Sequence, residues 1–167
     1  VISLPPHRAA SSLTMTPRLL LLALLTPTAA LAADCPSPVP VSDLRDVLGT
    51  AEAAFSSQDV DGLSAAVDEA RAALPCLDGP ITTDDAAHLH RVEALSDFLA
   101  RDLDGTVLHY RAVVRLKPDY TLPEGIAPPG GPLRGQFDIA RNAPAPTLRD
   151  VPAPAEGALL IDGAQVS

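Results

Sequence analysis

Three histidines in the middle of the chain are the residues whose type best suits metal binding. His88 and His90 lie two positions apart, so on a helix their side chains would point about 200° apart and could not share one ion. His109 belongs to a later segment and could approach one of them, but two histidines alone are too few for an ordinary zinc site. We therefore predict no metal site among these histidines.

Two Asp-x-Asp-Gly strings, at Asp59 and at Asp102, also bring carboxylates close together. A calcium loop needs oxygen ligands at its first, third, fifth and twelfth positions. In the second string these counts place Ala100 first and Arg111 twelfth, and the first string lacks the terminal glutamate. Asp59 and Asp102 are better interpreted as helix N-caps, because a carboxylate accepts hydrogen bonds from the free amides of a first helical turn.

Nothing else in the sequence resembles catalytic machinery. No serine lies in a nucleophile-elbow context, neither cysteine has a base beside it, and the glycines between residues 125 and 131 alternate with prolines instead of forming a phosphate loop. Asp84 and Asp85 belong to the first turn of an expected helix, where the helix dipole favours acidic groups. We expect a non-enzyme with no catalytic residue, no metal and no cofactor.

Cys35 and Cys76 are the two cysteines of the chain. The first lies just before an expected helix at about 42–57, and the second just after one at about 60–74. If these helices run antiparallel, the two thiols come within bonding reach, and in an oxidising compartment such a pair predicts a disulfide. A bridge closing about 40 residues could add roughly 3–4 kcal/mol. Two unpaired thiols are the alternative.

Residues 15–32 have the three parts of a secretory signal peptide, namely Arg18, an apolar run over 19–25 and the ending Ala30-Leu31-Ala32. The run is far shorter than the roughly 20 residues that span a bilayer, so we favour cleavage over a membrane anchor. A lipidated Cys35 is disfavoured because Asp34 precedes it. Residues 1–14 are interpreted as a non-native or mis-called extension. The mature protein is expected in the periplasm or outside the cell, without stable membrane insertion.

The composition limits the classes of molecule that the protein can bind. The chain has 167 residues, 12 of them Lys or Arg against 21 Asp or Glu, and 47% are apolar. Without residues 1–32 there are ten basic and 21 acidic residues, a net charge of −11. Such a chain lacks the basic face that nucleic-acid binding requires, and its apolar content argues against general disorder. We expect a protein or peptide partner and no nucleic acid.

An internal repeat organises residues 42–118. Residues 51–75 align without a gap on residues 94–118, at an offset of 43. Six of the 25 positions are identical: Ala51, Phe55, Asp59, Asp61, Gly62 and Pro75 match Ala94, Phe98, Asp102, Asp104, Gly105 and Pro118. A fixed period of this size predicts stacked helical hairpins.

Each half of the repeat has an apolar stripe at helical spacing. Thr82 and Asp85 have the spacing of a capping box at the start of the third helix. The residues expected to face the core are Leu44, Val47, Leu48, Ala51, Phe55, Val60, Leu63, Val67, Ala70 and Leu74 in the first half, and Leu89, Val92, Leu95, Leu99, Leu103, Thr106, Tyr110 and Val113 in the second.

A known repeat shares this pattern. The pattern resembles the tetratricopeptide repeat. It has a small residue within the first helix, an acidic residue at the turn, an aromatic residue in the second helix and a final proline. The matching positions are Ala94, Asp102, Tyr110 and Pro118, and, in the first copy, Ala51, Asp59, Ala70 and Pro75. The chain departs from the family at Gln58 and Arg101, where glycine is preferred, at Leu63 and Thr106, where alanine is preferred, and in a longer loop at 76–81. The resemblance implies a concave face that binds a protein or peptide.

The tail has a different character. Between Pro118 and Pro154 there are nine prolines, so a helix is expected only at 132–141, with proline in its first position. There Leu133, Phe137 and either Ile139 or Ala140 could cover the fourth helix. Residues 142–156 are expected to be a linker. Residues 157–163 predict a strand running into an Asp-Gly turn, which either pairs with the body or, as we favour, begins a β-domain truncated at residue 167.

We therefore predict a mainly α protein. Its helical domain, at residues 33–141, is expected to have two stacked antiparallel helical hairpins and a short fifth helix, and a Pro-rich tail ending in a β-strand follows. We expect a non-catalytic protein-interaction module of the cell envelope, with Arg91, Arg111 and Arg115 as the candidate partner-binding surface. The alternative is a structural spacer or stem for a C-terminal β-domain that carries the activity. An open groove at these arginines would favour the first function, and a groove filled by residues 132–141 the second.

Overall fold

The computed structural model describes residues 35–145 and the backbone of two short strands at 159–161 and 164–166. The helices are α1 (Val41–Ser56), α2 (Val60–Ala73), α3 (Thr83–Ala100), α4 (Leu103–Leu116) and α5 (Pro132–Arg141), and a 3₁₀ turn, η1 (Leu74–Cys76), follows α2. The protein is therefore mainly helical, as the sequence predicts. The expected extension and signal peptide, and residues 146–156 of the expected linker, lie outside the described residues.

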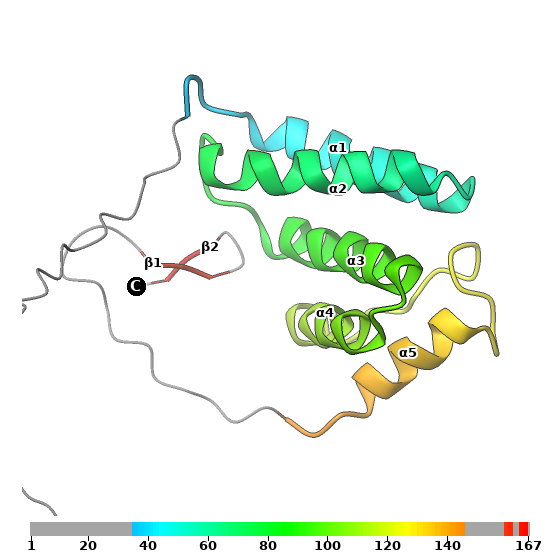
Figure 1. Ribbon diagram of the computed structural model, residues 1–167. Helices are drawn as coiled ribbons and strands as arrows, with labels where there is room; N and C mark the ends of the chain where they lie inside the picture. Colours follow the sequence, from blue (N-terminus) through cyan, green and yellow to red (C-terminus); the bar gives the residue numbers. More distant parts are fainter. Residues whose placement is uncertain (1–34, 146–158, 162–163, 167) are drawn as a thin grey trace, which may run out of the picture. The chain divides into compact units, whose positions relative to one another are not determined.

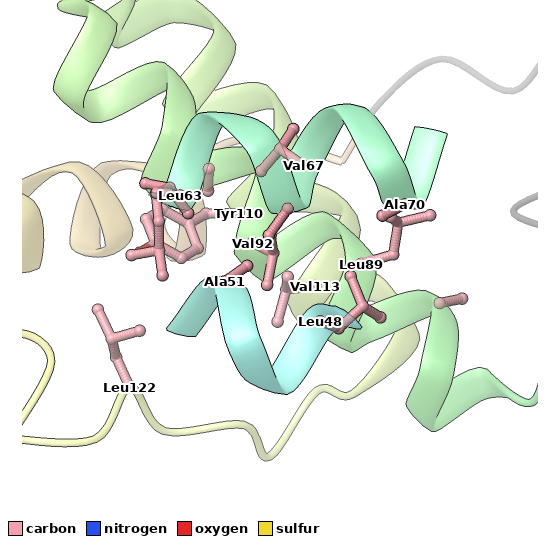
Figure 2. Close-up of a cluster of buried hydrophobic side chains, with 14 of the residues drawn as sticks. Leu48, Ala51, Leu63, Val67, Ala70, Leu89, Val92, Tyr110, Val113 and Leu122 are labelled. Carbon is pink, nitrogen blue, oxygen red and sulfur yellow. The ribbon is translucent and has the colours of Figure 1, made fainter. Parts of the chain in front are cut away.

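The helices pack in pairs. α1 lies against α2 and α3 lies against α4, while α3 also contacts both helices of the first pair and α5 packs on α4 (Figure 1). Apolar side chains from α1 to α4 meet in one buried cluster, which Leu122 joins from the segment after α4 (Figure 2). The predicted stripes supply most of this cluster, because the helical period places them on inward faces.

The two copies of the repeat share the same helix start. One carboxylate oxygen of Asp59 accepts a hydrogen bond from the Gly62 amide at 2.9 Å, and Asp102 does the same with the Gly105 amide at 2.9 Å. A Cβ atom at Gly62 would lie 2.3 Å from a carboxylate oxygen of Asp59. Glycine at this position therefore lets the capping carboxylate approach the helix, which explains why each Asp cap is followed by glycine three residues later.

The two copies also share the turn before that start. Gln58 and Arg101 have φ angles of 61° and 64°, in the left-handed region. The Asp102 amide then donates to the Asp97 carbonyl at 2.9 Å, and the equivalent amide in the first copy makes the equivalent bond at 2.9 Å. This is the bonding pattern that ends a helix with a left-handed residue. Glycine suits such a residue best, so Gln58 and Arg101 adopt a backbone conformation that is less favourable for residues with a side chain.

The start of α3 is tied to α1 by one carboxylate. Thr82 and Asp85 form a reciprocal capping box, and Arg45 of α1 donates two hydrogen bonds to the two oxygens of Asp85, at 2.7 and 2.9 Å. The hydrogen bond from Arg45, opposed in part by burial, holds the pKa of the Asp85 carboxyl well below its usual range. Two parallel hydrogen bonds between a guanidinium and a carboxylate fix the relative orientation of the two groups, in addition to pairing their charges.

This pKa shift predicts an acid-sensitive contribution to stability. A carboxyl with a folded pKa below its unfolded value of about 3.9 stabilises the fold above that pH, and the contribution is lost as the pH falls towards the folded pKa. Asp85→Asn should lower the free energy of unfolding by about 2 kcal/mol at pH 7, and by much less at pH 2. Urea unfolding at both pH values measures this, with Asp84→Asn, an exposed residue of the same helical turn, as control. An equal loss at both pH values would contradict the assignment.

A covalent clamp joins the beginning of α1 to the end of α2. Cys35 and Cys76 form a disulfide with a Cα–Cα distance of 5.4 Å. Beside it, the Val39 amide donates to the Cys76 carbonyl at 2.7 Å and the Asp78 amide donates to the Val39 carbonyl at 2.9 Å. An oxygen of the Asp78 side chain also accepts from the Val41 amide at 3.2 Å. Asp78 thus supplies the side-chain cap that the residue before α1, a proline, cannot provide.

α5 is held on α4 by its own apolar stripe. Leu133, Phe137 and Ala140 are buried, whereas Ile139 is 56% exposed, so Ala140 is the inward residue of the two alternatives that the sequence left open. The Phe137 ring meets the Tyr110 ring edge-on, with centroids 5.4 Å apart. Such aromatic contacts add to the stabilisation that burial provides.

Three residues expected in the core are exposed. Val60 is 55% exposed and Leu103 46% exposed, and Leu99 is at the border, at 37%. The prediction of an inward face was wrong for Val60 and Leu103, which begin α2 and α4. Each follows the chain reversal directly, where the preceding helix has already ended and cannot cover the side chain. Helical periodicity gives the direction of a face but not the length of its neighbour.

Two short strands lie near the C-terminus. β1 (Leu159–Ile161) and β2 (Ala164–Val166) pair antiparallel, with Leu159 opposite Val166. The sequence predicted one strand over 157–163 and a turn at Asp162-Gly163, and these two turn residues lie outside the described part of the chain.

Candidate interaction surface

The segment after α4, residues 117–131, which we call the return segment, lies against α1 and α3. The Tyr120 hydroxyl accepts a hydrogen bond from Arg91 of α3 at 3.2 Å, and the Arg91 guanidinium lies 5.8 Å from the centroid of the Tyr120 ring. Arg91 also forms an ion pair with Glu52 of α1, and its side chain is only 18% exposed. Arg91 is therefore engaged by the chain itself.

The return segment is anchored by its apolar and carbonyl groups. Leu122 and Ala127 are 3% and 1% exposed, and Leu122 reaches the cluster that contains Leu48 and Ala51 (Figure 2). Arg134 of α5 donates to the Leu122 carbonyl at 2.7 Å and to the Ala127 carbonyl at 2.8 Å. The side of the fold formed by α1 and α3 is consequently covered by residues of this chain.

Two of the three histidines in the middle of the chain, His90 of α3 and His109 of α4, contact each other. The Nδ1 atoms of His90 and His109 are 3.0 Å apart, a distance that requires one of them to donate and the other to accept. Burial, with a further contribution from His90, lowers the pKa of His109, and Asp97, 3.6 Å from its Nε2 atom, opposes this shift. His88 lies apart, 3.4 Å from Glu52. Within the described residues, no three side chains of metal-binding type converge.

Two carboxylates that the sequence pattern did not single out join the helices, one buried and one partly buried. Glu93 of α3 is 7% exposed and accepts a hydrogen bond from Arg71 of α2 at 2.9 Å, while Glu52 of α1 pairs with Arg91 of α3. Each glutamate lies beside apolar residues in its helix, and an acidic residue in such a position is a signal for a buried pair, because an unpaired buried charge is costly.

The outer side of α4 and α5 exposes large apolar side chains that no other described part of the chain covers. Leu108 is 64% exposed and Ile139 56% exposed, and with Leu103 they line a shallow hollow of about 630 Å³. The remaining lining residues of this hollow are Asp102, Asp104, Gly105, Val107, Arg111 and Gln136. Large apolar side chains exposed together in this way are typical of a contact surface.

A second hollow, of about 380 Å³, extends this surface towards the C-terminal ends of α4 and α5. Its charged lining residues are Arg111, Arg115 and Arg141, around Val114 and Ala140. Arg111 lines both hollows and donates to the Pro144 carbonyl at 3.0 Å. We call the two hollows together the α4–α5 face. It has acidic residues at one end, apolar residues in the middle and arginines at the other end.

The structure therefore brings together two of the three arginines of the predicted surface. Arg111 and Arg115 line the α4–α5 face, whereas Arg91 is not among its lining residues and contacts the return segment. The caps assigned to Asp59, Asp102 and Thr82 each accept a hydrogen bond from a first-turn amide. They act within the fold and are not part of the hollow's chemistry, although Asp102 lines its acidic end.

The chain matches no protein-family model, no curated protein and no solved structure. In the part that the structure describes, no helix is both long and apolar enough to cross a membrane.

Proposed function

We propose that this protein is an exported, non-catalytic protein-interaction module that contacts its partner through the α4–α5 face. The observation that carries the proposal is the exposure of Leu103, Leu108 and Ile139 on one side of two packed helices. Burying these side chains against a partner would remove apolar surface from water, which favours association. The charged residues at both ends of the face would orient that partner.

The resemblance to the tetratricopeptide repeat supports an interaction role, since two stacked antiparallel helical hairpins of that family form binding scaffolds. In this chain the α1–α3 side is covered by the return segment, so we place the partner on α4 and α5 instead. The signal-peptide pattern at 15–32 and the disulfide support export to the periplasm or the medium. The proposal requires no cofactor, metal or nucleic acid.

A single charge on the face tests the proposal. Leu108→Glu should abolish any complex that the exported protein forms, because a carboxylate would have to be buried among apolar groups. The matched control is Ala65→Glu, since Ala65 is exposed and occupies the position equivalent to Leu108 in the first copy of the repeat. Native electrophoresis of the exported fraction would compare the size of the complexes. Complexes that survive Leu108→Glu would contradict the proposal.

A spacer role is the second candidate, and one observation favours it. The return segment and α5 bury their apolar residues on the helical body, so the chain itself occupies the α1–α3 side and part of α4. In that case the body would only hold a C-terminal β-domain at a distance. A protein that binds no other chain in the exported fraction and stays monomeric at every concentration, with and without Leu108→Glu, would support the spacer.

A further inference from the structure

We propose that the partner of the α4–α5 face is a second copy of this chain, paired with its α4 helices antiparallel across a two-fold axis near Leu108. This inference rests on the proposed function and names the partner of the same surface. Its basis is the order of charged and apolar residues along α4. When two copies of this helix run antiparallel, the acidic end of each lies opposite the basic end of the other.

Four residues form one stripe on α4. Asp104, Leu108, Arg111 and Arg115 follow one another at spacings of four, three and four residues, the spacing of a single helical face. All four line the hollows of the α4–α5 face. The stripe therefore runs from an acidic residue, through a leucine that is 64% exposed, to two basic residues.

An antiparallel pairing makes this stripe self-complementary. With Leu108 of one copy opposite Leu108 of the other, Asp104 lies opposite the position between Arg111 and Arg115 of the second copy. At a rise of about 1.5 Å per residue, both arginines are then within about one helical turn of the carboxylate. The two-fold axis repeats this contact, so one arrangement forms two sets of ion pairs around an apolar centre.

The arginines are available for such a contact. Among the described residues, Arg115 has no ion-pair partner, and Arg111 donates to a backbone carbonyl only. Asp104 likewise has no cation beside it in that part of the chain. The stripe thus brings to the surface one anion and two cations that would find their opposite charges in a second copy.

The charge of the whole molecule also favours this face over others. The chain is strongly acidic, so most surfaces of two copies repel each other. The exposed sides of α1 and α2 have several acidic residues, namely Asp43, Asp46, Asp61, Asp68 and Glu69. On the α4–α5 face, Asp102 and Asp104 are balanced by Arg111, Arg115 and Arg141, which allows two copies to approach there.

The interface should be small and the dimer weak. Only Leu103, Leu108 and Ile139 are large apolar residues exposed on the face, which is typical of interfaces below about 1,200 Å² in total. We expect a dissociation constant on the order of 10–100 µM. Sedimentation equilibrium of the exported chain between about 1 µM and 1 mM covers this range. Leu108→Glu should weaken dimerisation at least about tenfold, and Ala65→Glu should leave it unchanged.

A charge exchange tests the antiparallel arrangement itself. Asp104→Arg alone, and Arg111→Asp together with Arg115→Asp, should each weaken the dimer about tenfold, because each change places like charges opposite each other. The chain with all three substitutions should regain the dimer, since the ion pairs form again with reversed signs. Thermal unfolding of each variant confirms that its fold is intact. A triply substituted chain that dimerises no better than these two variants would overturn the antiparallel pairing.

The outcome for the unmodified chain separates this inference from the proposed function. A monomer at every concentration would overturn dimerisation, and a complex of the exported protein with a different protein, abolished by Leu108→Glu, would then still support the proposed function. A chain that is monomeric in both experiments would overturn both.

Discussion

Replacing Cys35 and Cys76 with serine should lower the free energy of unfolding by about 4 kcal/mol. The bridge closes a loop over a sequence separation of 41 residues, and the chain-entropy model gives about 4 kcal/mol for a loop of that size. The effect is large for a helical body this small, whose total stability is expected in the range of about 5–15 kcal/mol. Urea unfolding of the oxidised parent and of the serine variant measures the difference.

The noncovalent part of the same clamp provides the control. Asp78→Ala removes the side-chain cap on the Val41 amide but leaves the disulfide, and should cost about 1 kcal/mol. Reduction of the parent protein with a thiol reagent should reproduce the loss of the serine variant. A serine variant that loses less unfolding free energy than the Asp78 variant would contradict the prediction. The backbone hydrogen bonds of Val39 with Cys76 and Asp78 would then hold the helix ends together without the bridge.

Phe137→Ala should lower the free energy of unfolding by about 3–5 kcal/mol. Its ring is 1% exposed and meets the rings of Tyr110 and Tyr120 edge-on, with centroids 5.4 and 5.9 Å away. Removing the ring leaves a cavity between α4, α5 and the return segment, so contacts of all three segments are lost together. Urea unfolding followed by circular dichroism measures the change.

The neighbouring residue Ile139 provides a matched comparison. Ile139 is on the same helix but 56% exposed, and Ile139→Ala should change stability by less than about 0.5 kcal/mol. The same substitution would weaken the proposed dimer, because Ile139 lines the α4–α5 face. A large loss of stability for Ile139→Ala, or a small loss for Phe137→Ala, would contradict the orientation of α5.

Much of the helical framework could be predicted from the sequence because its signals are local. Asp59, Asp102 and Thr82 mark helix starts through hydrogen bonds made within one turn, and the predicted fifth helix, 132–141, coincides with α5. The pairing of the two cysteines depends on one further step, the assumption that α1 and α2 run antiparallel. Residues such as Val60 and Leu103 were misplaced because their exposure depends on where a neighbouring helix ends.

The candidate surface was harder to predict for the same reason. The sequence grouped Arg91 with Arg111 and Arg115, but the Pro-rich return segment engages Arg91 through Tyr120, and periodicity cannot place such a segment. The sequence does contain a signal for the exposed apolar part of the α4–α5 face. Leu108 lies two residues from the buried Tyr110. Residues at this spacing point to nearly opposite sides of a helix, so the sequence already indicated that Leu108 faces away from the core.

The central claim is that the α4–α5 face contacts another protein chain, and site-specific photo-cross-linking tests it most directly. A photoreactive residue at position 108 in the exported protein should give a discrete cross-linked product, at twice the monomer mass if the partner is a second copy. The same residue at the equivalent exposed position 65 of the first repeat should give none. The absence of a product at position 108, or equal products at both positions, would contradict the account.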